Sequence, residues 1–124
     1  MKVIIAKYIL IIISSIFYVI VGIKHFIEPD FFLPIVPPYL PYHLELVYIS
    51  GVFEILFGSM ILIPKYRYWG SIGLILLLIA VFPANIFLYQ SKEAQEALGA
   101  SQEIATWRLP IQVILILVAY WIRK

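Results

Sequence analysis

Five polar residues fall within or at the edges of long apolar segments, where their side chains could form a binding site. Glu54 lies ten residues into the apolar run 44–63. A carboxylate at that depth in a membrane costs several kcal/mol unless it is protonated, paired or faces a cavity. The other four residues lie in the remaining apolar segments: His25, Asn85, Arg108 and Gln112. A carboxyl, an imidazole and a guanidinium in an apolar cavity can bind a polar headgroup and exchange protons with it.

Each of these residues also has a purely structural interpretation. Arg108 could be a helix-end residue whose guanidinium reaches the membrane interface, and His25 could be an interfacial histidine. Asn85 and Gln112 could form hydrogen bonds between helices, which contribute about 0.6 kcal/mol each on average in membranes. Glu54 could be a structural partner of Arg108 or of His25. The joint placement of all five favours a ligand-binding site more than any single residue does.

The composition predicts one integral membrane domain over residues 1–124. The chain is 64% hydrophobic and 13% charged, with a mean hydropathy of +1.02, whereas soluble domains average about 25% charged residues. The net charge of +2 is small and the basic residues are spread among loops, which argues against a nucleic-acid partner. The absence of cysteine excludes disulfides and thiolate metal sites within this chain. Two histidines and scattered acids do not predict a metal site.

Four apolar segments are long enough to be helices that span a bilayer, which requires about 20 residues. The sequence therefore predicts an all-α four-helix bundle in the lipid bilayer. Its fourth span is short, but Trp107 and Trp121 could anchor its ends at the two interfaces. The predicted helices lie at about 3–26, 44–63, 69–89 and 107–122.

The distribution of basic residues predicts that both termini are cytoplasmic. In a four-span topology, six basic residues lie on the side of the termini and three on the opposite side, and the positive-inside rule places the richer side in the cytoplasm. Glu54 then lies ~15 Å below Leu44, at 1.5 Å per residue. The polar residues therefore share the outer half of the bundle. The six basic residues on the side of the termini are Lys2, Lys7, Lys65, Arg67, Arg123 and Lys124, and the three on the opposite side are Lys24, Lys92 and Arg108.

The two predicted outer loops differ in character. Residues 28–43 read EPDFFLPIVPPYLPYH, and their five prolines argue against a regular helix. This loop is rich in proline and aromatic residues, so it is either an interfacial anchor or a lid over a site. Residues 90–105 are polar and helix-prone before Gly99, which predicts a solvated connector.

Helical spacing places small and polar residues on one face of several spans. Small residues let helices approach closely in membranes, so these faces should point into the bundle. Pro83, two residues before Asn85, should free a carbonyl one turn earlier, and Arg108 and Gln112 are four apart on one face. On the first predicted span this face comprises Ser15, Tyr18, Gly22 and His25, and on the second span it comprises Gly51, Glu54 and Gly58.

Four short motifs resemble those of DoxX-like membrane proteins. They are GIKHF at 22–26, ISGVFE at 49–54 followed by Gly58, FPAN at 82–85 and WRLPIQ at 107–112. They occur in the same order and cover the chain from Gly22 to the last span. The resemblance implies a small four-helix protein of the bacterial inner membrane. By motif match, the resemblance implies that the functional positions of the family correspond to His25, Glu54, Asn85, Arg108 and Gln112.

The resemblance leaves three functions open. Some DoxX-like proteins are subunits of membrane oxidoreductases such as thiosulfate:quinone oxidoreductase, others accompany superoxide-defence or thiol-redox proteins, and a distant animal branch assists receptor assembly. A redox accessory subunit would bind a quinone through His25 and Arg108, use Glu54 for protons, and receive electrons from a redox protein partner. The alternatives are a non-enzymatic assembly or scaffold protein and a small proton-coupled transporter. The chain encodes no cofactor motif and no complete catalytic or redox centre, and a homo-oligomer is also compatible with it.

Overall fold

The computed structural model describes residues 2–124, and every regular element in this range is a helix. Four of the helices are long and apolar enough to cross a membrane, namely α1, α3, α4 and α6. This confirms the predicted all-α chain with four candidate spans. The elements are α1 (Lys2–Ile27), α2 (Pro29–Phe32), the 3-10 helix η1 (Leu33–Ile35), α3 (His43–Met60), α4 (Arg67–Gln90), α5 (Lys92–Leu98) and α6 (Gln102–Ile122).

The largest error in the predicted boundaries is at α6, which begins at Gln102 rather than near residue 107. The Ser101 hydroxyl accepts a hydrogen bond from the Ile104 backbone N–H at 3.2 Å, so Ser101 caps the helix before its apolar part starts. Arg108 therefore lies well inside α6 instead of at its first turn. An apolar run in a sequence locates the part of a helix that suits lipid. It does not show where the helix begins when the first turn is polar.

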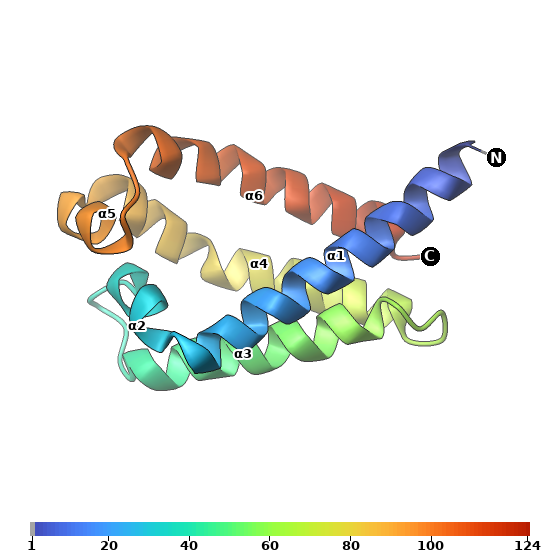
Figure 1. Ribbon diagram of the computed structural model, residues 1–124, viewed down its shortest axis with the longest axis horizontal. Coiled ribbons are helices and arrows are strands. Elements are labelled where there is room, and N and C mark those ends of the chain that lie inside the picture. The colour runs from blue at the N-terminus through green and yellow to red at the C-terminus, as the bar shows by residue number, and fades with distance from the viewer. Residues whose placement is uncertain (1) are drawn as a thin grey trace.

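The four long helices pack in the spatial order α1, α3, α4, α6. Figure 1 shows α1 crossing α6 near the two chain termini and diverging from it toward the opposite end, where α2 and α5 lie. Ile11 of α1 packs with Ala119 and Ile122 of α6 in the buried cluster near the termini. Both termini lie at the same end of the molecule, as an even number of spans requires.

The contact between α1 and α3 is close because glycine lies on both sides of it. A Cβ atom added at Gly22 would lie 2.8 Å from the Gly51 carbonyl oxygen, and one added at Gly51 would lie 2.7 Å from His25 Cβ. The small-residue face of α1 is buried, as predicted, at Ser15, Tyr18, Gly22 and His25. The two predicted faces therefore meet each other, and this contact brings His25 and Glu54 together.

The two loops at the end opposite the termini pack against each other, and both contain short helices. Pro29 and Pro34 occupy first-turn positions of α2 and η1, where the missing N–H has no partner to lose, so the prolines permit short helices. Ile35 of η1 packs with Ala94 of α5 and Ala105 of α6 in a second buried cluster. Segment 90–105 is thus a partly buried cap and not only a solvated connector.

Gln95 holds this cap on the end of α4. Its side-chain amide is buried and donates hydrogen bonds to the carbonyl oxygens of Leu88 at 3.0 Å and Tyr89 at 3.2 Å. These carbonyls belong to the last turn of α4, where no backbone N–H of the helix is available to bond them. Gln95 also donates to Gln102 of α6 at 2.9 Å, so one side chain ties three helices together.

The close α1–α3 contact predicts that Gly51→Ala destabilises the protein. The new methyl group would lie 2.7 Å from His25 Cβ and 2.9 Å from the Gly22 carbonyl oxygen, so the helices must separate. We expect a loss of about 1 to 3 kcal/mol in the free energy of unfolding, measured by equilibrium unfolding in micelles. The control is Val52→Ala, because the Val52 side chain is 51% exposed on the same helix. Equal losses in the two variants would contradict the interpretation of this contact.

Candidate functional site

A cavity of about 420 Å³ lies between α1, α3 and α4, on the side of the bundle where α2 and η1 cover it. This volume falls in the range of ligand pockets, about 300 to 1,000 Å³. Most of its lining is apolar, from residues such as Val21, Phe53 and Leu77. Four of the five polar residues selected from the sequence also line it: His25, Glu54, Asn85 and Arg108.

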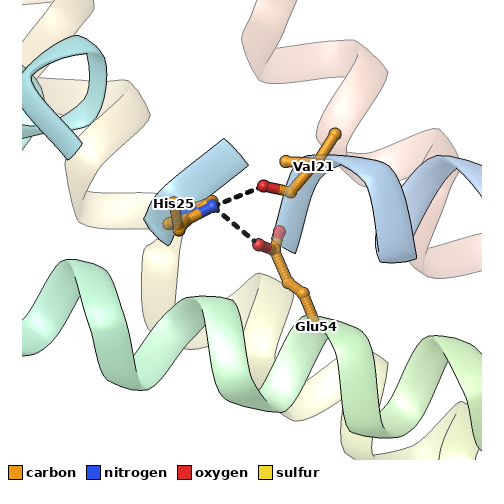
Figure 2. A network of polar contacts seen from close by, with 3 residues as sticks. All are labelled: Val21, His25 and Glu54. Carbon is orange, nitrogen blue, oxygen red and sulfur yellow. Dashed lines mark hydrogen bonds and ion pairs between the residues drawn. The ribbon is translucent and has the colours of Figure 1, made fainter. Parts of the chain in front are cut away.

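The first polar wall of the cavity is formed by His25 of α1 and Glu54 of α3. Figure 2 shows the Glu54 carboxyl group pointing from α3 toward the His25 ring. His25 Nδ1 lies 3.1 Å from Glu54 Oε2 and 2.7 Å from the Val21 carbonyl oxygen. Because a carbonyl oxygen only accepts hydrogen bonds, Nδ1 carries a hydrogen and donates it to Val21. Glu54 Oε2 lies beside this donor, and no other donor in residues 2–124 reaches it.

The loop between α1 and α3 covers this wall. The Phe32 ring stacks on the His25 imidazole, with centroids 3.8 Å apart and planes at 14°. This stacking holds the ring plane of His25, and the sequence did not identify Phe32 as a site residue. The apolar and aromatic composition of segment 28–43 was the available signal, and it left the interfacial-anchor and lid alternatives open. Loop residues that line the cavity are Phe32, Ile35, Val36, Pro37 and Leu40.

The second polar wall is a chain of hydrogen bonds between α4 and α6. Arg108 Nε donates to Asn85 Oδ1 at 3.1 Å. Asn85 Nδ2 donates to Gln112 Oε1, and Gln112 Nε2 donates to the Leu78 carbonyl oxygen. Gln112 is only 2% exposed and is not among the residues that line the cavity. Gln112 therefore supports Asn85 from behind, and Asn85 in turn fixes Arg108.

Gln112 binds a backbone carbonyl in the α4 turn that precedes Pro83. Proline has no N–H, so the carbonyl of Ile79, four residues earlier, has no helical donor. The acceptor of the Gln112 hydrogen bond is the adjacent carbonyl of Leu78. The sequence predicted a freed carbonyl in this turn, but the hydrogen bond from Gln112 goes to the neighbouring carbonyl.

The arrangement of the two walls defines what the cavity can bind. Arg108 has only one partnered nitrogen, Nε, which leaves its terminal N–H groups available as donors. Glu54 offers carboxyl oxygens as acceptors. Among residues 2–124, no group of three or more His, Cys, Asp or Glu side chains is placed to hold a metal ion. The cavity therefore offers hydrogen-bond donors at the Arg108 wall and acceptors at the Glu54 wall.

The fold and the site define a small protein of four candidate membrane spans with one polar cavity at the end away from its termini. The chain belongs to the family described as Domain of unknown function (DUF8561), which matches residues 14–123. The matched range contains both polar walls of the cavity. No curated protein and no solved structure matches the chain.

The hydrogen-bond chain predicts energetic coupling between Asn85 and Gln112. In a double-mutant cycle of Asn85→Ala and Gln112→Ala, we expect a coupling of about 0.6 to 1.7 kcal/mol, the range of such bonds in membranes. The measurement is the free energy of unfolding of the four proteins in micelles.

The control cycle combines Asn85→Ala with Gln102→Ala. Gln102 lies on the same helix as Gln112 but donates to Tyr89 and Thr106, so these two losses should add within about 0.5 kcal/mol. Additivity in both cycles would show that the Asn85–Gln112 bond contributes nothing.

Proposed function

We propose that this protein is an accessory subunit of a membrane redox system and that its cavity holds the headgroup of a quinone-like or lipid-like ligand. One observation carries the ligand part of the proposal. His25, Glu54, Asn85 and Arg108 come from four different helices, yet all line one cavity whose remaining surface is mostly apolar. An apolar pocket with a few converging polar groups is typical of small-molecule sites.

The geometry supports different roles for the two walls. Arg108 would donate hydrogen bonds to a ligand oxygen, since its terminal nitrogens have no protein partner in residues 2–124. His25 would not donate to a ligand carbonyl through Nδ1, because the Nδ1 hydrogen is directed at the Val21 carbonyl oxygen. Its ring would instead pack beside the Glu54 carboxyl group. Glu54 would exchange a proton with the bound headgroup.

The redox part of the proposal rests on the resemblance to DoxX-like proteins. The sequence has no cysteine and no cofactor motif, so a redox protein partner would supply or take up the electrons.

The proposed setting is a bacterial inner membrane, with both termini in the cytoplasm and the cavity in the outer half. Two observations support this orientation. The basic residues are concentrated at the termini and at the α3–α4 turn, and the termini lie at the end opposite α2 and α5. The positive-inside rule favours a cytoplasmic location for that end.

The orientation can be tested with single cysteines, because the chain has none of its own. A membrane-impermeant maleimide should label Glu96→Cys in intact cells. It should label Lys2→Cys and Lys124→Cys only after the cells are permeabilised. All three positions are exposed, so burial does not limit labelling, and the cysteine-free chain is the blank. The reverse pattern would place the cavity in the cytoplasmic half.

A non-enzymatic assembly or scaffold protein is the second candidate, and one observation favours it. Asn85, Gln112 and Arg108 bond to one another and to a backbone carbonyl, so this wall is also explained as interhelical hydrogen bonding. In that case the cavity would hold bulk lipid or a partner's side chain. The two candidates therefore differ in whether a specific small molecule occupies the cavity.

Mass spectrometry of organic extracts from the purified protein separates the two candidates. We expect a quinone to be enriched over bulk lipid in the wild-type protein. Its amount should fall about tenfold or more in Glu54→Gln, because the carboxyl contact with the ligand headgroup is lost. The control is Glu45→Gln, an exposed glutamate on the same helix that does not line the cavity. If wild type and both variants carry only bulk phospholipid, the assembly function becomes the better account.

A further inference from the structure

Arg108 is the side chain of the cavity lining whose charge is permanent. The lining contains one carboxyl group, one imidazole and one guanidinium, from Glu54, His25 and Arg108. A carboxyl group and an imidazole can each become neutral when they are buried in apolar surroundings, whereas a guanidinium keeps its proton in proteins. Since most of the remaining lining is apolar, the Arg108 wall carries a fixed positive charge.

The protein supplies no negative charge to Arg108. Among residues 2–124 the ion-pair contact joins His25 and Glu54, and no carboxylate oxygen lies within 4.0 Å of the Arg108 guanidinium. The partner of Arg108 is Asn85, whose amide oxygen accepts from Nε at 3.1 Å. Asn85 donates in turn to Gln112, which donates to a backbone carbonyl of α4. Every group that holds the guanidinium is therefore neutral.

The position of Asn85 decides which edge of the guanidinium is free. Asn85 accepts from Nε, and neither terminal nitrogen of Arg108, Nη1 or Nη2, has a hydrogen-bond partner among residues 2–124. The N–H groups of these two nitrogens form a planar edge that matches two oxygens of a phosphate or a carboxylate. Since Arg108 lines the cavity, a ligand in the cavity can reach this edge.

Resting on the function proposed above, which places a ligand headgroup in this cavity, we propose that the headgroup carries an anionic oxygen and that the terminal nitrogens of Arg108 bind it. The ligand is then an anionic amphiphile, whose apolar part contacts residues such as Val21, Phe53 and Leu77. Two kinds of membrane molecule share this chemistry: a quinone-like ring with an ionised hydroxyl group, and a lipid phosphate. A neutral headgroup would leave the charge of Arg108 uncompensated in apolar surroundings, which is costly.

The test compares two pairs of probes, and the members of each pair differ in charge. The first pair is a hydroxynaphthoquinone with a decyl tail, which is an anion at neutral pH, and its O-methyl ether, which is neutral. The second pair is dodecyl phosphate and dodecanol. Binding to the full-length protein is measured by equilibrium dialysis in phosphatidylcholine nanodiscs, and empty nanodiscs give the partition of each probe into lipid. We expect the anionic member of at least one pair to bind about tenfold or more tightly than its neutral member, as hydrogen bonds between charged groups imply.

Three variants assign this preference to Arg108. Arg108→Gln should bring the two members of the pair within about twofold of each other, because an amide carries no charge. Arg108→Lys should keep part of the preference, since it retains the charge but not the planar edge. The matched control is Lys92→Gln, which removes a positive charge from an exposed side chain of α5 that does not line the cavity. It should keep the wild-type preference.

The two pairs also separate the sources of the anion. A preference in the quinone pair supports an acidic quinone-like ligand, and a preference confined to the phosphate pair supports a lipid phosphate and removes the quinone. Equal affinity of the wild-type protein for the anionic and neutral members of both pairs would overturn the proposal while leaving the headgroup site in place, whatever the folding of the variants. A preference that persists in Arg108→Gln would overturn it as well. If no probe binds more than it binds to empty nanodiscs, both the anionic ligand and the proposed headgroup site are wrong.

Discussion

The close approach of α1 and α3 at Gly22 and Gly51 is the contact on which the rest of the site depends. Neither position has room for a Cβ atom, since each would meet the facing helix within 3 Å. Glu54 lies one turn from Gly51, so the same contact carries its carboxyl group to His25. A wider spacing would separate the Glu54 carboxyl group from the His25 ring. The glycines thus provide helix packing and the first polar wall together.

The second polar wall forms through hydrogen bonds between α4 and α6, and the α1–α3 contact does not determine it. Gln112 of α6 binds the carbonyl oxygen of Leu78 in the α4 turn that precedes Pro83. Asn85 then connects Gln112 to Arg108, so that a guanidinium is fixed at the cavity by residues on two helices. Because α1 packs on α3 and α6 packs on α4, the two walls belong to two helix pairs. Between these pairs lies the cavity that α2 and η1 cover.

Much of the fold and the position of the site could be predicted from residue types and spacing. Helical periodicity placed His25 and Glu54 on small-residue faces, and the depth of each residue placed both walls at one end of the bundle. The partner of Glu54 could not be predicted, since His25 and Arg108 both lay at a suitable depth and the choice depends on helix register and packing. The stacking of Phe32 on His25 was also out of reach, because it depends on the path of an irregular loop. The early start of α6 was missed because a cap by Ser101 leaves no hydropathy signal.

The central claim is that a ligand headgroup lies between the Glu54 wall and the Arg108 wall, and photoaffinity labelling tests it most directly. The full-length protein in lipid nanodiscs would be irradiated with an azidoquinone, and the adducts would be mapped by peptide mass spectrometry. The account predicts adducts on cavity-lining segments such as 17–25 and 77–85 that excess unlabelled quinone removes. Adducts confined to the exposed residues Ile12, Ile13 and Ile16, unchanged by excess quinone, would contradict it.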